Sequence, residues 1–182
     1  MKKILVILSL IFIAFYSNAQ YKEASLQASG LTCAMCSNAI QKSLEALPFV
    51  GEVDTDLQTS TYHIKFKKDQ QVSFDALREA VENAGFSVAK LSVKAEFNQV
   101  KIEADTHITL DGQTLHFVNV KSQTLNGEKE FRLLDKKFTS DKEHKKYAAY
   151  TNMSCYKTGV MESCCAGKAD IAGGARVYHI TL

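Results

Sequence analysis

The stretch ASLQASGLTCAMCSNAIQKSLEALP, residues 24–48, decides the fold of the first half of this chain. Apolar and polar side chains first alternate, as in a half-buried strand, which we expect over residues 23–30. The period then changes, and apolar side chains recur at helical spacing over residues 36–47 until Pro48 ends the helix. The stretch therefore predicts a strand, a short loop that carries Cys-x-x-Cys, and a helix.

Further along the chain the patterns predict two more strands, a second helix and a last strand. Residues 53–57 and 62–66 alternate and form a hairpin, and Ser73 is a suitable N-cap for a helix over residues 74–84. The last strand shifts its alternation after Val88, which indicates a β-bulge or the junction to another domain. The resulting order βαββαβ is the ferredoxin-like arrangement, so the fold class is α+β.

Cys33 and Cys36 are the chemical centre of this region. Cys36 falls at the helix start, where unpaired backbone N–H groups and the helix dipole favour thiolate over thiol. Two such ligands can close on one ion, which suits Cu(I) or Hg(II), whereas Zn(II) prefers four ligands. Met35 brings a thioether near the pair, and we expect it to serve in packing.

The loop resembles the signature Gly-Met-Thr-Cys-x-x-Cys of the heavy-metal-associated domain family, with Leu31 in place of the usual Met. The resemblance covers about residues 22–93 and includes the run AVENAGF at residues 80–86. It implies a Cu(I) metallochaperone or transporter module, or the periplasmic mercury-binding protein of a resistance system. It also implies that Cys33 and Cys36 hold the ion near the surface and release it by thiolate exchange.

Two other interpretations of the cysteine pair stay open. One is a structural disulfide, and the other is a redox pair of the thioredoxin type, which also begins a helix. The thioredoxin family implies a cis-proline loop, and the single proline, Pro48, lies too early for it, so redox exchange is disfavoured. Phe86 stands where bacterial members of the heavy-metal-associated family often have Tyr, and we expect a core aromatic there.

Residues 1–19 have the pattern of a secretory signal peptide. Lys2 and Lys3 precede an apolar run, and small residues occupy the cleavage positions before Gln20. Cleavage would remove two lysines and leave equal numbers of basic and acidic side chains, with no later segment apolar enough to span a membrane. We therefore expect an exported protein, with the bacterial periplasm as its compartment.

We expect a heavy-metal-associated domain over residues 20–95 and a β-rich domain over residues 96–182, which the sequence assigns to no family. Asp-Gly at residues 111–112 and Asn-Gly at residues 126–127 predict hairpin turns. Ser140 begins a capping box before a short helix. About five strands and one helix fit a small barrel, such as the OB type.

Three cysteines gather in the second half, namely Cys155, Cys164 and Cys165. They suggest a second soft-metal site of Cys155 with one or both of the others, assisted by Met153, Met161 or His179. Two alternatives, which we rank below the metal site, are a disulfide from Cys155 to Cys164 or Cys165 and a redox relay that resolves an oxidised Cys33–Cys36 pair.

The histidines carry a weaker signal. His63 and His144 are expected at the surface. His116 and His179 lie in expected strands, where a buried histidine with hydrogen-bond partners is commoner than a metal ligand.

Composition excludes several function classes. A net charge of +2 is too small for a nucleic-acid-binding protein, and no Ser-His-Asp order, P-loop or pair of carboxylates indicates an enzyme. We expect a non-enzymatic carrier of Cu(I), or of another soft heavy-metal ion. Its expected partner is a metal-transporting ATPase or efflux component, and we expect no nucleic-acid binding and no membrane insertion.

Overall fold

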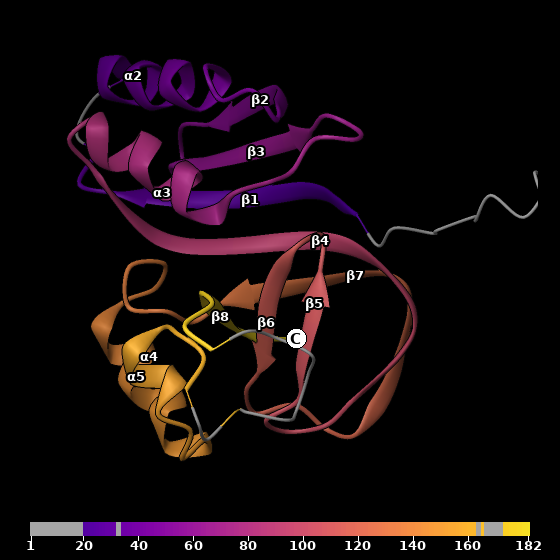
Figure 1. The fold of residues 1–182 in the computed structure, drawn as a ribbon. Coiled ribbons are helices and arrows are strands. Elements are labelled where there is room, and N and C mark those ends of the chain that lie inside the picture. The colour runs from indigo at the N-terminus through magenta and orange to yellow at the C-terminus, as the bar shows by residue number, and fades with distance from the viewer. Residues whose placement is uncertain (1–19, 32–33, 163–164, 166–172) are drawn as a thin grey trace, which may run out of the picture.

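The computed structural model describes residues 20–31, 34–162, 165 and 173–182. The expected signal peptide, Cys33 and Cys164 lie outside the described residues. Figure 1 shows two lobes that share one long strand, β4 (Ser87–Ile102).

The N-terminal lobe has the predicted βαββαβ order. Its elements are β1 (Tyr21–Ser29), α2 (Ala34–Glu45), β2 (Val50–Asp56), β3 (Thr61–Phe66), α3 (Phe74–Asn83) and the first part of β4. The strands lie in the order β2-β3-β1-β4, all antiparallel, and both helices cover one face of the sheet (Figure 1). Ile40 and Leu44 of α2 are fully buried, and the Ser73 hydroxyl caps α3 by accepting the N–H of Ala76. The ferredoxin-like prediction is confirmed.

The shift of alternation after Val88 is a β-bulge in β4. Gln27 of β1 pairs with Lys90, whereas Ala28 pairs with Val88, so Ala89 is an extra residue on β4. The bulge reverses which positions of β4 face the helices, as a one-residue insertion must. The sequence pattern thus located an irregularity of the sheet.

The C-terminal lobe continues the same sheet. It contains β5 (His107–Leu110), β6 (Gln113–Phe117), β7 (Gln123–Leu133), α4 (Asp141–Tyr147), the 3₁₀ turn η1 (Ala148–Tyr150), α5 (Cys155–Thr158) and β8 (Val177–Thr181). The eight described strands follow the order β2-β3-β1-β4-β7-β8-β6-β5, and among their pairings only that of β6 with β8 is parallel. The predicted turn at residues 111–112 and the predicted cap at Ser140 are both present.

Two expectations for this lobe are wrong. Asn-Gly at residues 126–127 makes no hairpin turn, because it lies inside β7, where Gly127 takes a φ of +71° opposite Phe97. The freedom of glycine is used there beside a register shift between β4 and β7. The strands also form no closed OB-type barrel, since no described pairing joins β5 back to β4 and the sheet order ends at β2 and β5.

One hydrophobic core crosses β4 from lobe to lobe. The ring of Phe74 on α3 meets Tyr21 at 5.0 Å, Tyr178 of β8 at 5.1 Å and Phe131 of β7 at 6.4 Å between centroids, each edge to face. The expected boundary after residue 95 falls within β4. The division into domains at that point stays a prediction.

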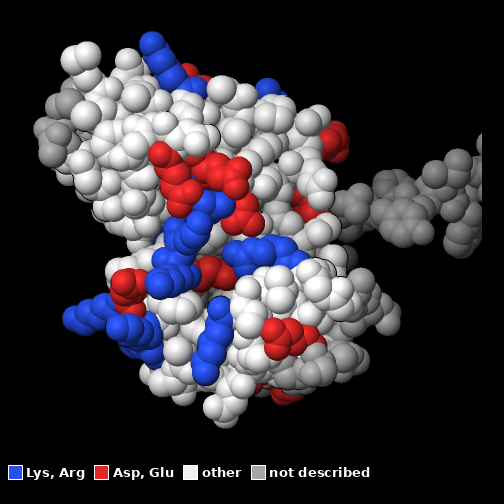
Figure 2. Space-filling view, turned by 60° about the vertical axis from the view of Figure 1, so that its left-hand side comes forward, with Lys and Arg blue, Asp and Glu red and all other residues white. Residues whose placement is uncertain are grey.

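Charges on the face drawn in Figure 2 are interspersed around the junction of the lobes rather than sorted by sign. Arg176 illustrates the pairing, since it contacts Asp75 of the N-terminal lobe at 3.4 Å and Asp135 of the C-terminal lobe at 3.1 Å. Among the described helices, none combines the length and the hydropathy needed to cross a bilayer.

Candidate metal sites

The loop between β1 and α2 brings Cys36 to the surface. Gly30 follows the strand with a φ of +88°, a left-handed conformation that glycine adopts without strain. Helix α2 begins at Ala34, so Cys36 lies in its first turn, half-buried, at the positive end of the helix dipole. Met35 is 84% exposed, so the packing role expected for it is wrong. Cys33 lies outside the described residues.

Hydrogen bonds from Tyr62 of β3 hold the first turn of α2 in place. The Tyr62 hydroxyl lies 2.9 Å from the Ser37 hydroxyl and donates to the Ser37 carbonyl at 3.3 Å. Burial raises the pKa of Tyr62, and Cys36 adds to the rise, so the phenol stays protonated at neutral pH. The sequence analysis missed this role, because Tyr62 looks like any other inward residue of its strand.

Two apolar side chains, one of them aromatic, pack beside the turn that follows β1. Leu31 and Phe86 are half-buried and pack against the hydrophobic cluster. The Phe86 ring also lies beside the turn, since a Cβ added at Gly30 would be 3.8 Å from it. Phe86 therefore acts in packing, as predicted.

A second cluster of metal-ligand side chains lies inside the C-terminal lobe. The hairpin β5–β6 places His107 opposite His116, and their rings stack with centroids 4.2 Å apart. Cys155 begins α5 with its Sγ 3.8 Å from Nε2 of His107 and 3.6 Å from Nδ1 of His116. All three side chains are buried, and one ligand atom from each lies within 4.8 Å of the other two.

Asp105 sets the orientation of both imidazoles. Its backbone carbonyl lies 3.1 Å from Nδ1 of His107, and its carboxylate lies 2.9 Å from Nε2 of His116. Because these oxygens accept, both ring nitrogens donate. The lone pairs are then on Nε2 of His107 and Nδ1 of His116, the two atoms that face Cys155.

His116 is neutral at physiological pH. Burial, with His179 and His107 close by, lowers its pKa to about 3, although Asp105 acts in the opposite sense. A neutral imidazole keeps a lone pair on one nitrogen, which a positively charged one does not.

His179 continues the row of histidines on β8. It pairs with His116 across the parallel strands, and its Nδ1 donates to Asp135 at 3.1 Å. Burial raises the pKa of Asp135, but the hydrogen bonds from His179 and the charge of Arg176 bring it below its ordinary value. Nε2 of His179 is buried and has no hydrogen-bond partner in the part of the chain that the structure describes.

The remaining candidates are placed as follows. Cys165 belongs to the same apolar cluster as Cys155, but its Sγ contacts Sδ of Met153 at 3.6 Å. Cys164 lies outside the described residues. His63 is exposed, as expected, whereas His144 is half-buried, because its ring stacks on Tyr156 of α5. His107 is a ligand candidate that the sequence analysis did not single out.

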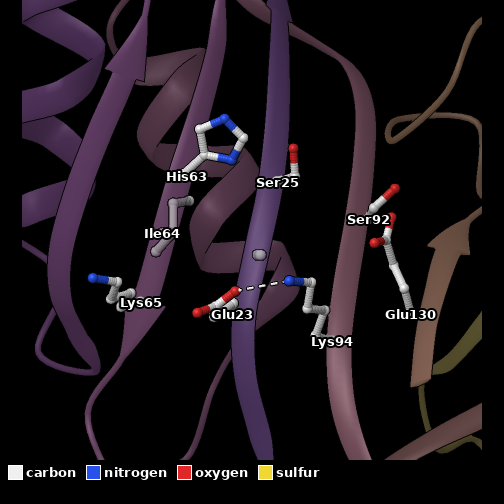
Figure 3. Close-up of a pocket in the computed structure, with 9 residues that line it drawn as sticks. Glu23, Ser25, His63, Ile64, Lys65, Ser92, Lys94 and Glu130 are labelled. Atoms are coloured by element: carbon white, nitrogen blue, oxygen red, sulfur yellow. Dashed lines mark hydrogen bonds and ion pairs between the residues drawn. The ribbon is translucent and has the colours of Figure 1, made fainter. Parts of the chain in front are cut away.

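A shallow polar depression lies on the open face of the sheet (Figure 3). Glu23, His63, Lys94 and Glu130 line it from four neighbouring strands, and Lys94 donates to Glu23 at 3.1 Å. The depression holds no cysteine, and its charges pair across the strands. It has the character of a solvated sheet surface.

Comparison with known proteins assigns the N-terminal lobe. The model of the heavy-metal-associated domain matches residues 25–87. The copper chaperone CopZ of Bacillus subtilis is 30% identical over 69 residues, which are 38% of this chain and 99% of that protein. A copper-exporting P-type ATPase of the same organism is 32% identical over 80 residues, which are 44% of this chain and 10% of the ATPase. This chain thus spans about a tenth of that ATPase.

A solved structure that is also similar to part of this chain is a domain of the yeast copper transporter, determined in apo and Cu(I)-loaded states. It is 34% identical, with 36% of this chain and 88% of that domain covered and a TM-score of 0.33.

Proposed function

The chain belongs to the heavy-metal-associated domain family, and we propose that its N-terminal lobe carries one Cu(I) ion on Cys33 and Cys36. The main support is the position of Cys36 in the first turn of α2, half-buried at the surface and three residues after Cys33. A copper chaperone and a copper-exporting ATPase are similar to this lobe. Cu(I) accepts two soft ligands, which is what a Cys-x-x-Cys loop offers.

The proposed mechanism is ligand exchange. A thiolate of the acceptor adds to the ion while both cysteines still hold it, and the chain's thiolates then leave one at a time. Cu(I) tolerates this passage because it accepts two or three soft ligands. No covalent bond of an organic substrate forms or breaks, so the protein acts as a carrier and not as an enzyme.

The tie between Tyr62 and Ser37 supports this role. Since it fixes the first turn of α2 to β3, Cys36 keeps its direction during the exchange. The cysteine then offers the ion to the acceptor from a rigid element.

We further propose that the carrier works outside the cytoplasm, in the bacterial periplasm. The support is the basic and apolar pattern of residues 1–19. Its acceptor would be a metal-transporting ATPase or an efflux component. Mass spectrometry of the secreted or periplasmic protein tests the export: a chain that begins at Gln20 is expected, and a full-length chain in the cytoplasm would contradict it.

An anaerobic titration tests the metal assignment. The reduced chain from Gln20 onward, which contains every described residue, competes for Cu(I) with a coloured chelator. We expect the variant Cys33→Ser/Cys36→Ser to bind one tightly held ion fewer than the unaltered chain, and Met35→Ala to bind the same number. Equal numbers of ions in the double serine variant and the unaltered chain would refute the proposal.

Two further measurements address the alternatives. Displacement of Cu(I) by equimolar Hg(II), with no return of Cu(I), would favour a mercury-binding protein. Absence of tight Cu(I) binding, together with turnover on a mixed disulfide, would favour thiol–disulfide exchange.

A further inference from the structure

We propose that His107, His116 and Cys155 bind a second Cu(I) ion in the interior of the C-terminal lobe. This site shares no residue with the Cys-x-x-Cys loop, so either site can be present without the other.

The sulfur and nitrogen atoms already have the spacing that a bound ion requires. Bonds of the lengths known for zinc, about 2.3 Å to sulfur and about 2.0–2.1 Å to nitrogen, put sulfur and nitrogen about 3.6 Å apart at a tetrahedral angle and about 3.8 Å apart at a trigonal one. The two sulfur–nitrogen separations at Cys155 are 3.6 and 3.8 Å. The two sulfur–nitrogen separations therefore match those around a single ion, and the two nitrogens lie within 4.8 Å of one another.

The hydrogen bonds made by the two histidines are also those found at metal sites. Histidine ligands in metalloproteins donate their other ring N–H to a carboxylate or a backbone carbonyl, which fixes the tautomer. Asp105 supplies one of each, its carbonyl to His107 and its carboxylate to His116. Asp105 is itself held in a left-handed conformation, with a φ of +60°, and its N–H donates to the carbonyl of Phe117.

A hydrogen bond from the thiol is a weaker account of the same contacts. The Cys155 thiol has one proton and can serve one nitrogen, whereas both nitrogen lone pairs face its sulfur. A cation accepts electron pairs from the sulfur and from both nitrogens at once.

The surroundings favour Cu(I) over harder ions. The sulfur of Cys155 lies in a cluster of Met161, Cys165 and Val177, and no carboxylate belongs to the ligand set. One thiolate cancels the charge of Cu(I), which limits the cost of burying the ion, and Cu(I) accepts three ligands. Mg²⁺ and Ca²⁺ require oxygen ligands, which are absent from this set of three.

His179 offers a neighbouring donor. Its ring meets that of His116 edge to face at 5.1 Å, and its buried Nε2 has no hydrogen-bond partner among the described residues. A buried polar atom of this kind calls for an explanation such as an ion or a water. His179 therefore lies beside the proposed site, whose three ligands are His107, His116 and Cys155.

The test removes the surface site first. In the Cys33→Ser/Cys36→Ser chain from Gln20 onward, anaerobic Cu(I) titration is expected to show one tightly bound ion. X-ray absorption at the copper edge is expected to show two nitrogen neighbours and one sulfur neighbour. Adding Cys155→Ser is expected to weaken this binding at least about 100-fold, and adding Asp105→Ala about 10–100-fold. His63→Gln, on the exposed strand β3, serves as the matched control.

Several results would overturn the proposal. They are no tight Cu(I) in the double serine chain, an ion retained unchanged after Cys155→Ser, a copper environment of sulfur alone, or a site that takes Zn(II) and not Cu(I). Circular dichroism of each metal-free variant checks its fold. If the chain with Cys155→Ser does not fold, the X-ray absorption spectrum of the Cys33→Ser/Cys36→Ser chain still tests the proposal, because it identifies the atoms bound to copper.

Discussion

The surface loop and the buried cluster place metal ligands in opposite surroundings. Cys36 lies half-buried in a first helical turn beside the 84% exposed Met35, whereas Cys155, His107 and His116 are almost wholly enclosed. Gly30, Tyr62 and Phe86 position the surface loop. Strands β5 and β6, helix α5 and Asp105 position the buried cluster. Exposure therefore separates the two proposed tasks: an accessible ion can be passed on, and an enclosed ion is retained.

We expect the two lobes to unfold together, because one aromatic ring packs against both. Phe74→Ala removes the ring on which Tyr21 and Tyr178 converge from the two lobes. We expect the free energy of unfolding to fall by about 3–5 kcal/mol, because a fully buried aromatic is lost. Urea unfolding followed by tyrosine fluorescence and by far-UV circular dichroism should give one shared transition. Leu57→Ala, at an exposed site, should leave it unchanged, and two separate transitions would show that the regions are independent.

The proposed surface and buried sites should release copper at different rates. From the Cu(I)-loaded chain, an excess of chelator should remove one ion quickly and the second at least about 100-fold more slowly, because release from an enclosed site needs local opening. Cys33→Ser/Cys36→Ser should abolish the fast phase, and Cys155→Ser the slow one. A single phase that neither variant alters would remove the distinction.

The pH dependence of the metal-free chain tests the buried cluster alone. The pKa of His116 is about 3 in the folded chain, against an ordinary value of 6.5, so protonation favours the unfolded state. This contribution to stability is fully present above pH 6.5 and is lost as the pH falls toward 3, by up to about 1.4 kcal/mol per pH unit. His107 and His179 face this ring and oppose its protonation, whereas Asp105 favours it.

The measurement is urea unfolding at pH 7, 6 and 5 with a chelator present. His116→Asn should flatten the slope, and His63→Asn should keep it. Equal stability of the unaltered chain at the three pH values would contradict the burial of a neutral imidazole.

A smaller effect is expected at the support of the surface loop. Tyr62→Phe removes the hydroxyl that joins β3 to Ser37, and we expect a loss of about 1 kcal/mol in stability. Cu(I) affinity at the loop should fall less than tenfold, and the slowly released ion should be unaffected. Tyr150→Phe, at a partly exposed position, is the control. A change in the slow phase would mean that the two sites are coupled.

The smallest effect is expected at Met35. Because its side chain is 84% exposed, Met35→Ala should change the free energy of unfolding by less than about 0.5 kcal/mol. Thermal unfolding of the metal-free chain measures this. A larger loss would mean that the thioether packs, as the sequence had suggested.

Much of the N-terminal lobe was predictable, because its signals are local. Alternation, helical spacing and the cap at Ser73 gave the order of elements, and a change of parity located the bulge at Ala89. The C-terminal lobe was less predictable, because its pairings join distant segments. An Asn-Gly pair fits a strand beside a register shift as readily as a hairpin turn, and only the partner strand decides which.

The buried cluster shows where sequence reasoning stopped short. A two-residue turn at 111–112 fixes the pairing of its hairpin, and counting outward from it puts residue 107 opposite residue 116. The histidine pair could therefore have been found. The approach of Cys155 could not, since no local pattern places α5 over a hairpin about forty residues earlier in the chain.

The strand that both lobes share has a further consequence for delivery. In an isolated βαββαβ unit β4 is an edge, but here β7 lies along it and uses its hydrogen-bonding groups (Figure 1). In the described residues the N-terminal lobe is therefore joined to the C-terminal lobe by paired strands and not by a flexible linker, so the two lobes turn as one body. The proposed acceptor would then have to approach the Cys-x-x-Cys loop itself, from directions that the C-terminal lobe leaves open.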